Sequence, residues 1–81
     1  MNTKAKLLDA IRANPRGVRF SSACLAAEFL GFERKGGVGS HCTFVHAGET
    51  ALLNFQNRNG LIPPYQAHQL IAMIEKYRAK S

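Results

Sequence analysis

The chain has 81 residues, of which 46% are hydrophobic, and a formal net charge of +6. This length allows one domain with a modest core, and no apolar run approaches the roughly 20 residues that a membrane-spanning helix needs. The spacing of Cys24 and Cys42 excludes a CxxC-type zinc site and a disulfide framework, and favours a reducing cytoplasm. The positive charge favours an acidic partner such as nucleic acid, an acidic protein or an anionic membrane surface. It is also compatible with a role in solubility alone.

The first predicted helix covers residues 4–13. Leu7, Leu8 and Ile11 recur within it at helical spacing. The Asn-Pro-Arg-Gly sequence that follows is expected to end the helix, because the residue before a proline avoids the α region.

A second helix is predicted over residues 21–30. Ser21 or Ser22 can serve as its N-cap, with Phe20 as a hydrophobic staple and Gly31 as a left-handed C-cap. Its buried face is expected to carry apolar side chains, namely Leu25, Ala26, Phe29 and Leu30.

Three strands are predicted in the middle of the chain, over residues 32–35, 40–46 and 50–56. The glycine-rich residues 36–39 form a turn, because such a run costs too much backbone entropy inside a strand. Side chains of the last two strands alternate between two faces. The apolar face is formed by Cys42, Phe44, Ala51, Leu53 and Phe55. The other face carries His41, Thr43, Val45, Leu52, Asn54 and Gln56.

The last predicted helix covers residues 64–76, after an Asn-Arg-Asn-Gly turn at residues 57–60. Its buried stripe is expected to contain Leu70, Ile71, Ile74 and Tyr77. The element order is helix, helix, three-stranded antiparallel meander, helix. Such an order defines an α+β two-layer sandwich, in which helices cover one sheet face and the other is open.

The segment GGVGSHCTFVH carries the chemistry, because Ser40 and His41 open a strand directly after the glycines. Histidine is the side chain best suited to proton transfer near neutral pH. RNA supplies its own nucleophile, the 2′-hydroxyl, so its cleavage needs a base, an acid and stabilisation of the phosphate. Backbone N–H groups of the glycine turn can approach a phosphate, and Arg34 and Lys35 can hold it. The segment therefore fits an RNA-cleaving site.

A plain interpretation stays open beside this one, since a glycine-rich hairpin with one exposed or structural histidine is common. For His46 and His68 the plain interpretation is favoured, because neither follows a glycine-rich or basic stretch. Tyr65 is the aromatic residue best placed for a surface role. The 5 carboxylates show no spacing typical of a metal site, so no metal and no cofactor are predicted.

Three blocks of the chain resemble, in order, the HicA family of toxin–antitoxin toxins. The matching blocks are LGFERKGGVGSHCTFVH, LNFQNRNG and PYQAHQL. The resemblance runs from about residue 21 to residue 77. It implies a fold similar to the double-stranded-RNA-binding domain over residues 21–81, with residues 1–20 as an N-terminal helical extension of the same globular domain. It also implies a cytoplasmic, metal-independent endoribonuclease that cleaves mRNA and arrests translation, and that a HicB-like antitoxin neutralises.

In that family the histidine of the Gly-Ser-His motif is catalytic, which implies this role for His41. The expected RNA contacts are Arg34, Lys35, Gly37, Gly39 and Ser40. Many members have a second histidine directly after the first, where this chain has Cys42, so the second proton-transfer group is not assigned. Two alternatives stay open: a non-catalytic RNA-binding domain of the same fold, and an interaction protein that holds an acidic partner.

Overall fold

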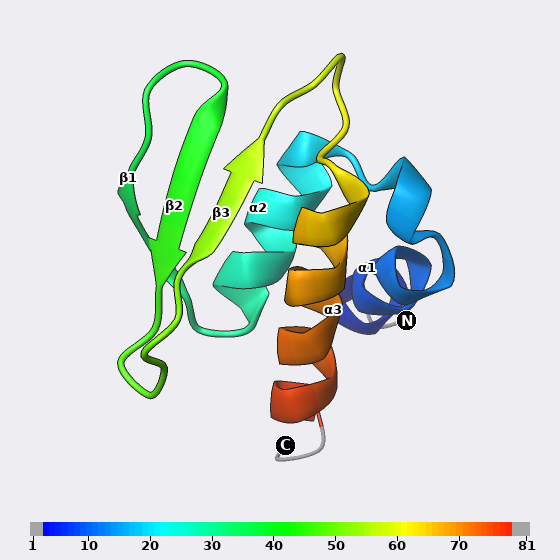
Figure 1. The fold of residues 1–81 in the computed structure, drawn as a ribbon. Helices are drawn as coiled ribbons and strands as arrows, with labels where there is room; N and C mark the ends of the chain where they lie inside the picture. Colours follow the sequence, from blue (N-terminus) through cyan, green and yellow to red (C-terminus); the bar gives the residue numbers. More distant parts are fainter. Residues whose placement is uncertain (1–2, 79–81) are drawn as a thin grey trace.

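The computed structural model describes residues 3–78 and has the α+β architecture that the sequence predicts. The elements are α1 (Thr3–Ala13), η1 (Pro15–Gly17), α2 (Phe20–Phe29), β1 (Glu33–Gly36), β2 (His41–Val45), β3 (Leu53–Gln56) and α3 (Pro64–Arg78). The antiparallel sheet has the strand order β1-β2-β3. Helices α2 and α3 cover one face of the sheet, and α1 packs against these helices on their far side (Figure 1).

The core lies between the sheet and the two helices that cover it. Phe44 and Phe55 are fully buried side by side, with ring centroids 5.8 Å apart. Leu70 and Ile74 of α3 are also fully buried and belong to the same core cluster. The predicted alternation of β2 and the predicted stripe of α3 are therefore confirmed.

The third strand is shorter than predicted, because it begins at Leu53 and not at residue 50. The last residue pair between β2 and β3 joins Phe44 to Leu53, and the residues before Leu53 lie outside this ladder. Ala51, which was expected on the apolar face, is exposed in the bend before β3.

The start of α2 also differs from the prediction. The N-cap is Arg19, which makes no side-chain capping bond, and Phe20 is the first helical residue. Ser21 and Ser22 lie inside the first turn, so the predicted serine cap and Phe20 staple are wrong. The N–H of Phe20 instead donates to the carbonyl of Gly60 at 2.9 Å, so a distant segment sets where this helix begins.

The end of α2 is as predicted. Gly31 has φ +94, and its N–H donates to the Glu28 carbonyl at 3.0 Å. The N–H of Phe32 donates to the Ala27 carbonyl, also at 3.0 Å, which completes a Schellman motif. The glycine therefore ends the helix through its left-handed conformation.

The buried face of α2 is formed by alanines and not by the large side chains. Ala23, Ala26 and Ala27 are fully buried, whereas Leu25 is 43% exposed. Because α2 contacts α1, α3 and the sheet, small side chains are needed to let it approach all three closely. The expectation that Leu25 faces the core is wrong for this reason.

Residues before α2 belong to the same core. Leu8, Ile11 and Val18 are buried in it. The N–H of Ile62 donates to the carbonyl of Val18 at 2.9 Å, next to the bond between Phe20 and Gly60. Residues 18–20 and 60–62 thus form a short backbone ladder. Among the described helices, none has both the length and the apolar character needed to cross a membrane.

Candidate functional site

His41 stands at the end of the sheet where the glycine turn, the end of β3 and the start of α3 meet. Its side chain is exposed on the open face, whereas Cys42, the next residue, is 1% exposed on the helix side. The carbonyl of Ser40 accepts the N–H of Asn57 at 2.8 Å, and the N–H of His41 donates to Val38 at 3.3 Å. These bonds hold the start of β2 in place.

The glycine turn before His41 depends on a glycine at one position. Gly37 has φ +121, and a Cβ atom there would lie 2.2 Å from the carbonyl oxygen of His41. Only glycine permits this approach between the turn and β2. Gly39 also has a positive φ, +63, but a Cβ there would meet nothing within 4 Å. Open space therefore lies beside Gly39.

A chain of hydrogen bonds indicates which nitrogen of a neutral His41 ring carries the proton. Gln56 lies directly opposite His41 across β2 and β3, and its Nε2 is 3.2 Å from Nε2 of His41. The Arg58 guanidinium donates to Oε1 of Gln56 at 3.0 Å. Because a guanidinium can only donate, this bond fixes the amide with its NH₂ group toward His41. In a neutral ring the Nε2 atom of His41 therefore accepts a hydrogen bond, which leaves the proton on Nδ1, 3.5 Å from the Ser40 hydroxyl.

Gln66 of α3 holds Gln56 from the other side. It is 3% exposed and is the buried polar residue of the described core. Its Oε1 accepts the N–H of Gln56 at 2.8 Å, on the free edge of β3. Its Nε2 donates to Oε1 of Gln56 at 3.4 Å and to the Tyr65 hydroxyl at 3.1 Å. One buried amide thus connects the edge strand, Tyr65 and the residue that contacts His41.

The side chains of the two cations predicted to hold a phosphate point to opposite faces of the edge strand β1. Arg34 pairs with Phe44 and points to the helix side of β1. Lys35, at the bulge that follows Arg34, lies on the open face, where its Nζ is 3.6 Å from the Glu33 carboxylate. Of these two cations, Lys35 is therefore the one that shares a face with His41.

Comparisons with known protein families, with curated proteins and with solved structures find no match to this chain.

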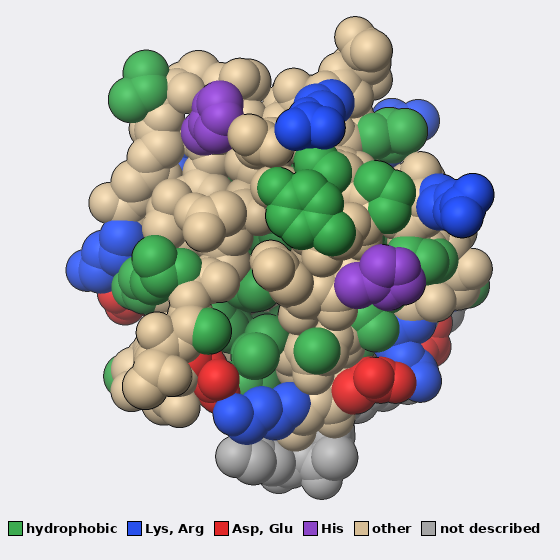
Figure 2. Space-filling view, in the orientation of Figure 1, with side chains coloured by type: hydrophobic (Ala, Val, Ile, Leu, Met, Phe, Trp, Pro, Cys, Tyr) green, Lys and Arg blue, Asp and Glu red, His purple; other side chains and the backbone are tan. Residues whose placement is uncertain are grey.

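Among the described residues, the basic side chains on the face drawn in Figure 2 do not gather in one patch around the site. Figure 2 shows Lys and Arg side chains dispersed over this face and separated by apolar and other residues. Individual charged contacts are therefore more informative about this site than the net charge of the chain. Among the described contacts, Arg58 is the cation joined to His41 through a single side chain, that of Gln56.

The residues Gln56, Arg58 and Gln66 were not predicted as site residues. Gln56 could have been found from the period-two pattern, which puts it on the open face beside His41. Arg58 and Gln66 could not, because their contacts depend on a turn and on the packing of α3 against the edge of β3. Tyr65 is exposed, as expected for a surface role.

His46 has a structural environment. Its ring contacts those of Phe32 and Tyr77, with centroid distances of 5.0 and 4.7 Å, and these two rings also contact each other at 6.2 Å. Its Nδ1 accepts the N–H of Gly48 at 2.9 Å, which shapes the loop between β2 and β3. These contacts agree with the plain interpretation of this histidine.

Glu49 ties the same loop to the end of α3. Its carboxylate accepts a bond from the Tyr77 hydroxyl and lies 2.6 Å from Nζ of Lys76. The two donors hold the pKa of Glu49 below its usual value. The carboxylate in turn raises the pKa of Tyr77 to about 12.

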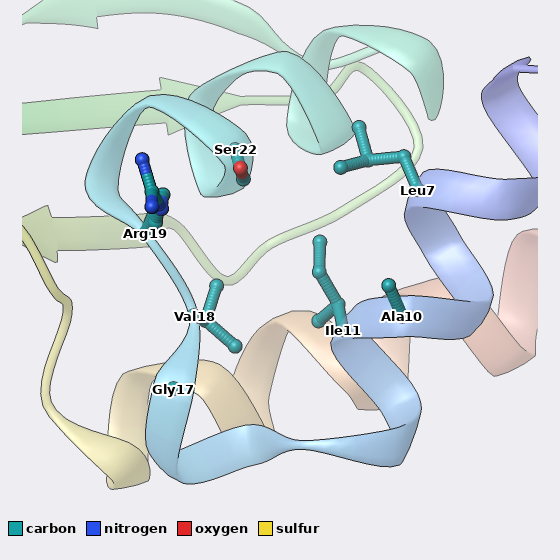
Figure 3. A pocket seen from close by; sticks show the side chains of 7 residues that line it. All are labelled: Leu7, Ala10, Ile11, Gly17, Val18, Arg19 and Ser22. Atoms are coloured by element: carbon teal, nitrogen blue, oxygen red, sulfur yellow. The ribbon is translucent and has the colours of Figure 1, made fainter.

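A pocket of about 190 Å³ lies between α1 and the start of α2, away from His41 (Figure 3). Its lining residues are Leu7, Ala10, Ile11, Gly17, Val18, Arg19 and Ser22. None of them transfers protons readily near neutral pH. Within residues 3–78, no three His, Cys, Asp or Glu side chains come together as a metal site would require.

Proposed function

We propose that this protein is an endoribonuclease of the HicA type, a toxin that cleaves single-stranded mRNA with His41 and so arrests translation. The observation that carries the proposal is the contact between His41 and Gln56 on the open sheet face. A neutral imidazole with an accepting Nε2 atom is the state that a general base needs. The core from α2 to α3 fits the arrangement of a double-stranded-RNA-binding domain, to which α1 adds a helix.

In the proposed reaction His41 is the general base. RNA brings its 2′-hydroxyl to Nε2 in place of the Gln56 amide, and His41 takes the proton. The 2′-oxygen then forms a bond to phosphorus while the bond from phosphorus to the 5′-oxygen breaks. The products are a 2′,3′-cyclic phosphate and a 5′-hydroxyl end. Lys35, Ser40 and the backbone at Gly39 stabilise charge on the phosphate oxygens.

The leaving 5′-oxygen also needs a proton. Cys42, at the place of the second histidine of many family members, is buried on the helix side of β2, so it cannot reach the reacting atoms. Water, or His41 once it has been protonated, therefore supplies this proton.

We also propose that a HicB-like antitoxin neutralises the protein in the cytoplasm. Val38 at the glycine turn and Leu52 before β3 are exposed apolar side chains. An acidic antitoxin that covers the open face would bury these residues and block His41. Co-purification with the product of an adjacent gene tests this partner. High expression of the free protein in a growing host, without harm, would contradict the toxin proposal.

The direct test is purified protein on single-stranded RNA, with and without EDTA. Cleavage is expected in both, because the described residues offer no cluster of metal ligands. His41→Ala should lower the rate roughly 10²–10⁴-fold, the usual effect of losing one proton-transfer group. His68→Ala, at an exposed position of α3, is the matched control and should keep full activity.

The products and a second substrate separate the alternatives. DNA of the same sequence should survive because it lacks the 2′-hydroxyl. RNA that is bound but never cleaved, by wild type and by His41→Ala alike, would support the non-catalytic RNA-binding domain instead. Full cleavage by His41→Ala would show that the chemistry lies on another residue.

A further inference from the structure

Tyr65 presents an exposed aromatic ring whose hydroxyl is held in place. The side chain is 58% exposed, at the second residue of α3. Its hydroxyl accepts the bond from the buried Gln66 amide at 3.1 Å. A ring anchored in this way keeps its face available, and little side-chain freedom is left to lose when something stacks on it.

The burial of Gln66 is hard to explain by packing alone. A buried amide costs free energy unless its polar atoms are hydrogen-bonded, and an apolar side chain could fill the same space without that requirement. The bonds that satisfy Gln66 lead to Gln56 and to Tyr65. Gln66 therefore fixes Tyr65 relative to the residue that contacts His41.

Arg58 is presented by a tight turn next to the same group. Asn59 and Gly60 have φ +55 and +90, the signs of a type I′ turn. The N–H of Arg58 donates to Leu61 at 2.8 Å, and the N–H of Leu61 donates back at 3.1 Å. Within the described residues no carboxylate forms an ion pair with Arg58, whereas Lys35 pairs with Glu33. Of the five donors on the guanidinium, Gln56 engages only one nitrogen, so an anion can bind the others.

Three chemically different groups thus meet around the pair of glutamines. His41 accepts a proton, Arg58 binds anions and Tyr65 offers a ring face. These groups match the parts of one nucleotide, namely its 2′-hydroxyl, its phosphate and its base. We propose that Tyr65 and Arg58 form a nucleotide subsite for single-stranded RNA beside His41, in which a base stacks on Tyr65 and the neighbouring phosphate binds Arg58. The proposal rests on the proposed function, because it deepens the RNA specificity of the same site.

Binding is measured in the His41→Ala background, so that no RNA is cleaved. Tyr65→Leu should weaken the binding of a short single-stranded RNA by about 5- to 150-fold, the range for loss of one base–aromatic stack. Tyr65→Phe should cause a smaller loss, because the ring stays and only the anchoring bond is removed. Arg58→Gln should weaken binding and lower the slope of log K against log salt by about 0.7, as expected for one phosphate contact. His68→Leu on the same helix is the control, and far-UV circular dichroism verifies that each variant is folded.

A substrate change makes the test specific to stacking. An RNA with one abasic nucleotide next to the cleavage position should bind His41→Ala more weakly, but the same change should add no further loss when Tyr65→Leu is also present. The subsite is overturned if Tyr65→Leu binds RNA as tightly as the control. It is also overturned if the abasic change weakens both proteins equally at every position tried. A Tyr65→Leu protein that loses only antitoxin binding would assign the ring to the protein partner and overturn the subsite too.

The two proposals fail in different ways. If the wild-type protein cleaves no RNA, the proposed function fails, yet the binding experiment still decides whether Tyr65 and Arg58 contact RNA. If RNA is cleaved by His41 and the Tyr65 and Arg58 variants behave like the control, only the subsite fails.

Discussion

Replacing Gln66 with leucine tests whether the buried amide organises the site. The substitution keeps a side chain of similar volume but removes every side-chain hydrogen bond that Gln66 makes. The N–H of Gln56 loses its acceptor on the edge of β3, and such an unsatisfied donor costs about 1–3 kcal/mol. The apolar leucine side chain offsets part of this cost, since burying it is favourable. We therefore expect a net loss of about 1–2 kcal/mol in the free energy of unfolding.

Urea denaturation at neutral pH measures this loss directly. A domain of this size has roughly 0.05–0.15 kcal/mol of stability per residue, so the variant should still fold. Its melting temperature should fall by about 4–8 °C for each kcal/mol lost, with no change in the denaturant slope. The control is Gln69→Leu, at an exposed position three residues later on α3, where no loss is expected.

The same variant allows a second measurement, and its result should not change if Gln66 only stabilises the fold. In the wild type, nitrogen NMR of the neutral His41 ring should show the proton on Nδ1. Without Gln66, the Gln56 amide loses one of the two groups that orient it, and the second tautomer should become populated. If Gln66→Leu is as stable as wild type and leaves the His41 tautomer unchanged, Gln66 does not position the site.

Three further predictions concern the core, the loop carboxylate and the thiol. Phe44→Ala should lower the free energy of unfolding by about 3–5 kcal/mol, whereas Leu52→Ala, at an exposed site, should change it by less than about 0.5 kcal/mol in urea titrations. The pKa of Glu49 is lower in the folded protein than its ordinary value of 4.5, so its contribution is present above that pH and is lost as the pH falls below it. Glu49→Gln should therefore reduce the loss in the free energy of unfolding that occurs as the pH falls below 4.5. Burial, together with the neighbouring Cys42 thiol, raises the pKa of the Cys24 thiol to about 12. Iodoacetamide at pH 8 should therefore alkylate Cys24 far more slowly in the native protein than in the unfolded protein.

Local patterns predict the parts of the fold whose causes are local. The alternation in β2 places Phe44 in the core because strand side chains point to opposite faces in turn. Gly31 ends α2 because a left-handed residue is needed there, and the Asn59-Gly60 pair forms a turn for the same reason. Each of these outcomes depends on a few neighbouring residues.

Features set by distant segments could not be predicted from such patterns. The start of α2 is determined by the bond to the carbonyl of Gly60, which no local capping rule contains. The exposure of Leu25 follows from the close approach of three elements to α2. At the site, His41 was predicted from its motif. The contribution of Gln66 was not, because it arises only where α3 packs against the edge of β3.

The backbone ladder between residues 18–20 and 60–62 has a consequence for folding order. It closes a long loop that contains α2 and the whole sheet, and closing such a loop costs more chain entropy than forming the local hairpins. Arg58 and Tyr65 flank the later arm of this ladder. We therefore expect both residues to take their final positions only after the first third of the chain has docked. During folding, His41 would then stand on formed strands before Arg58 and Tyr65 reach their final positions beside it.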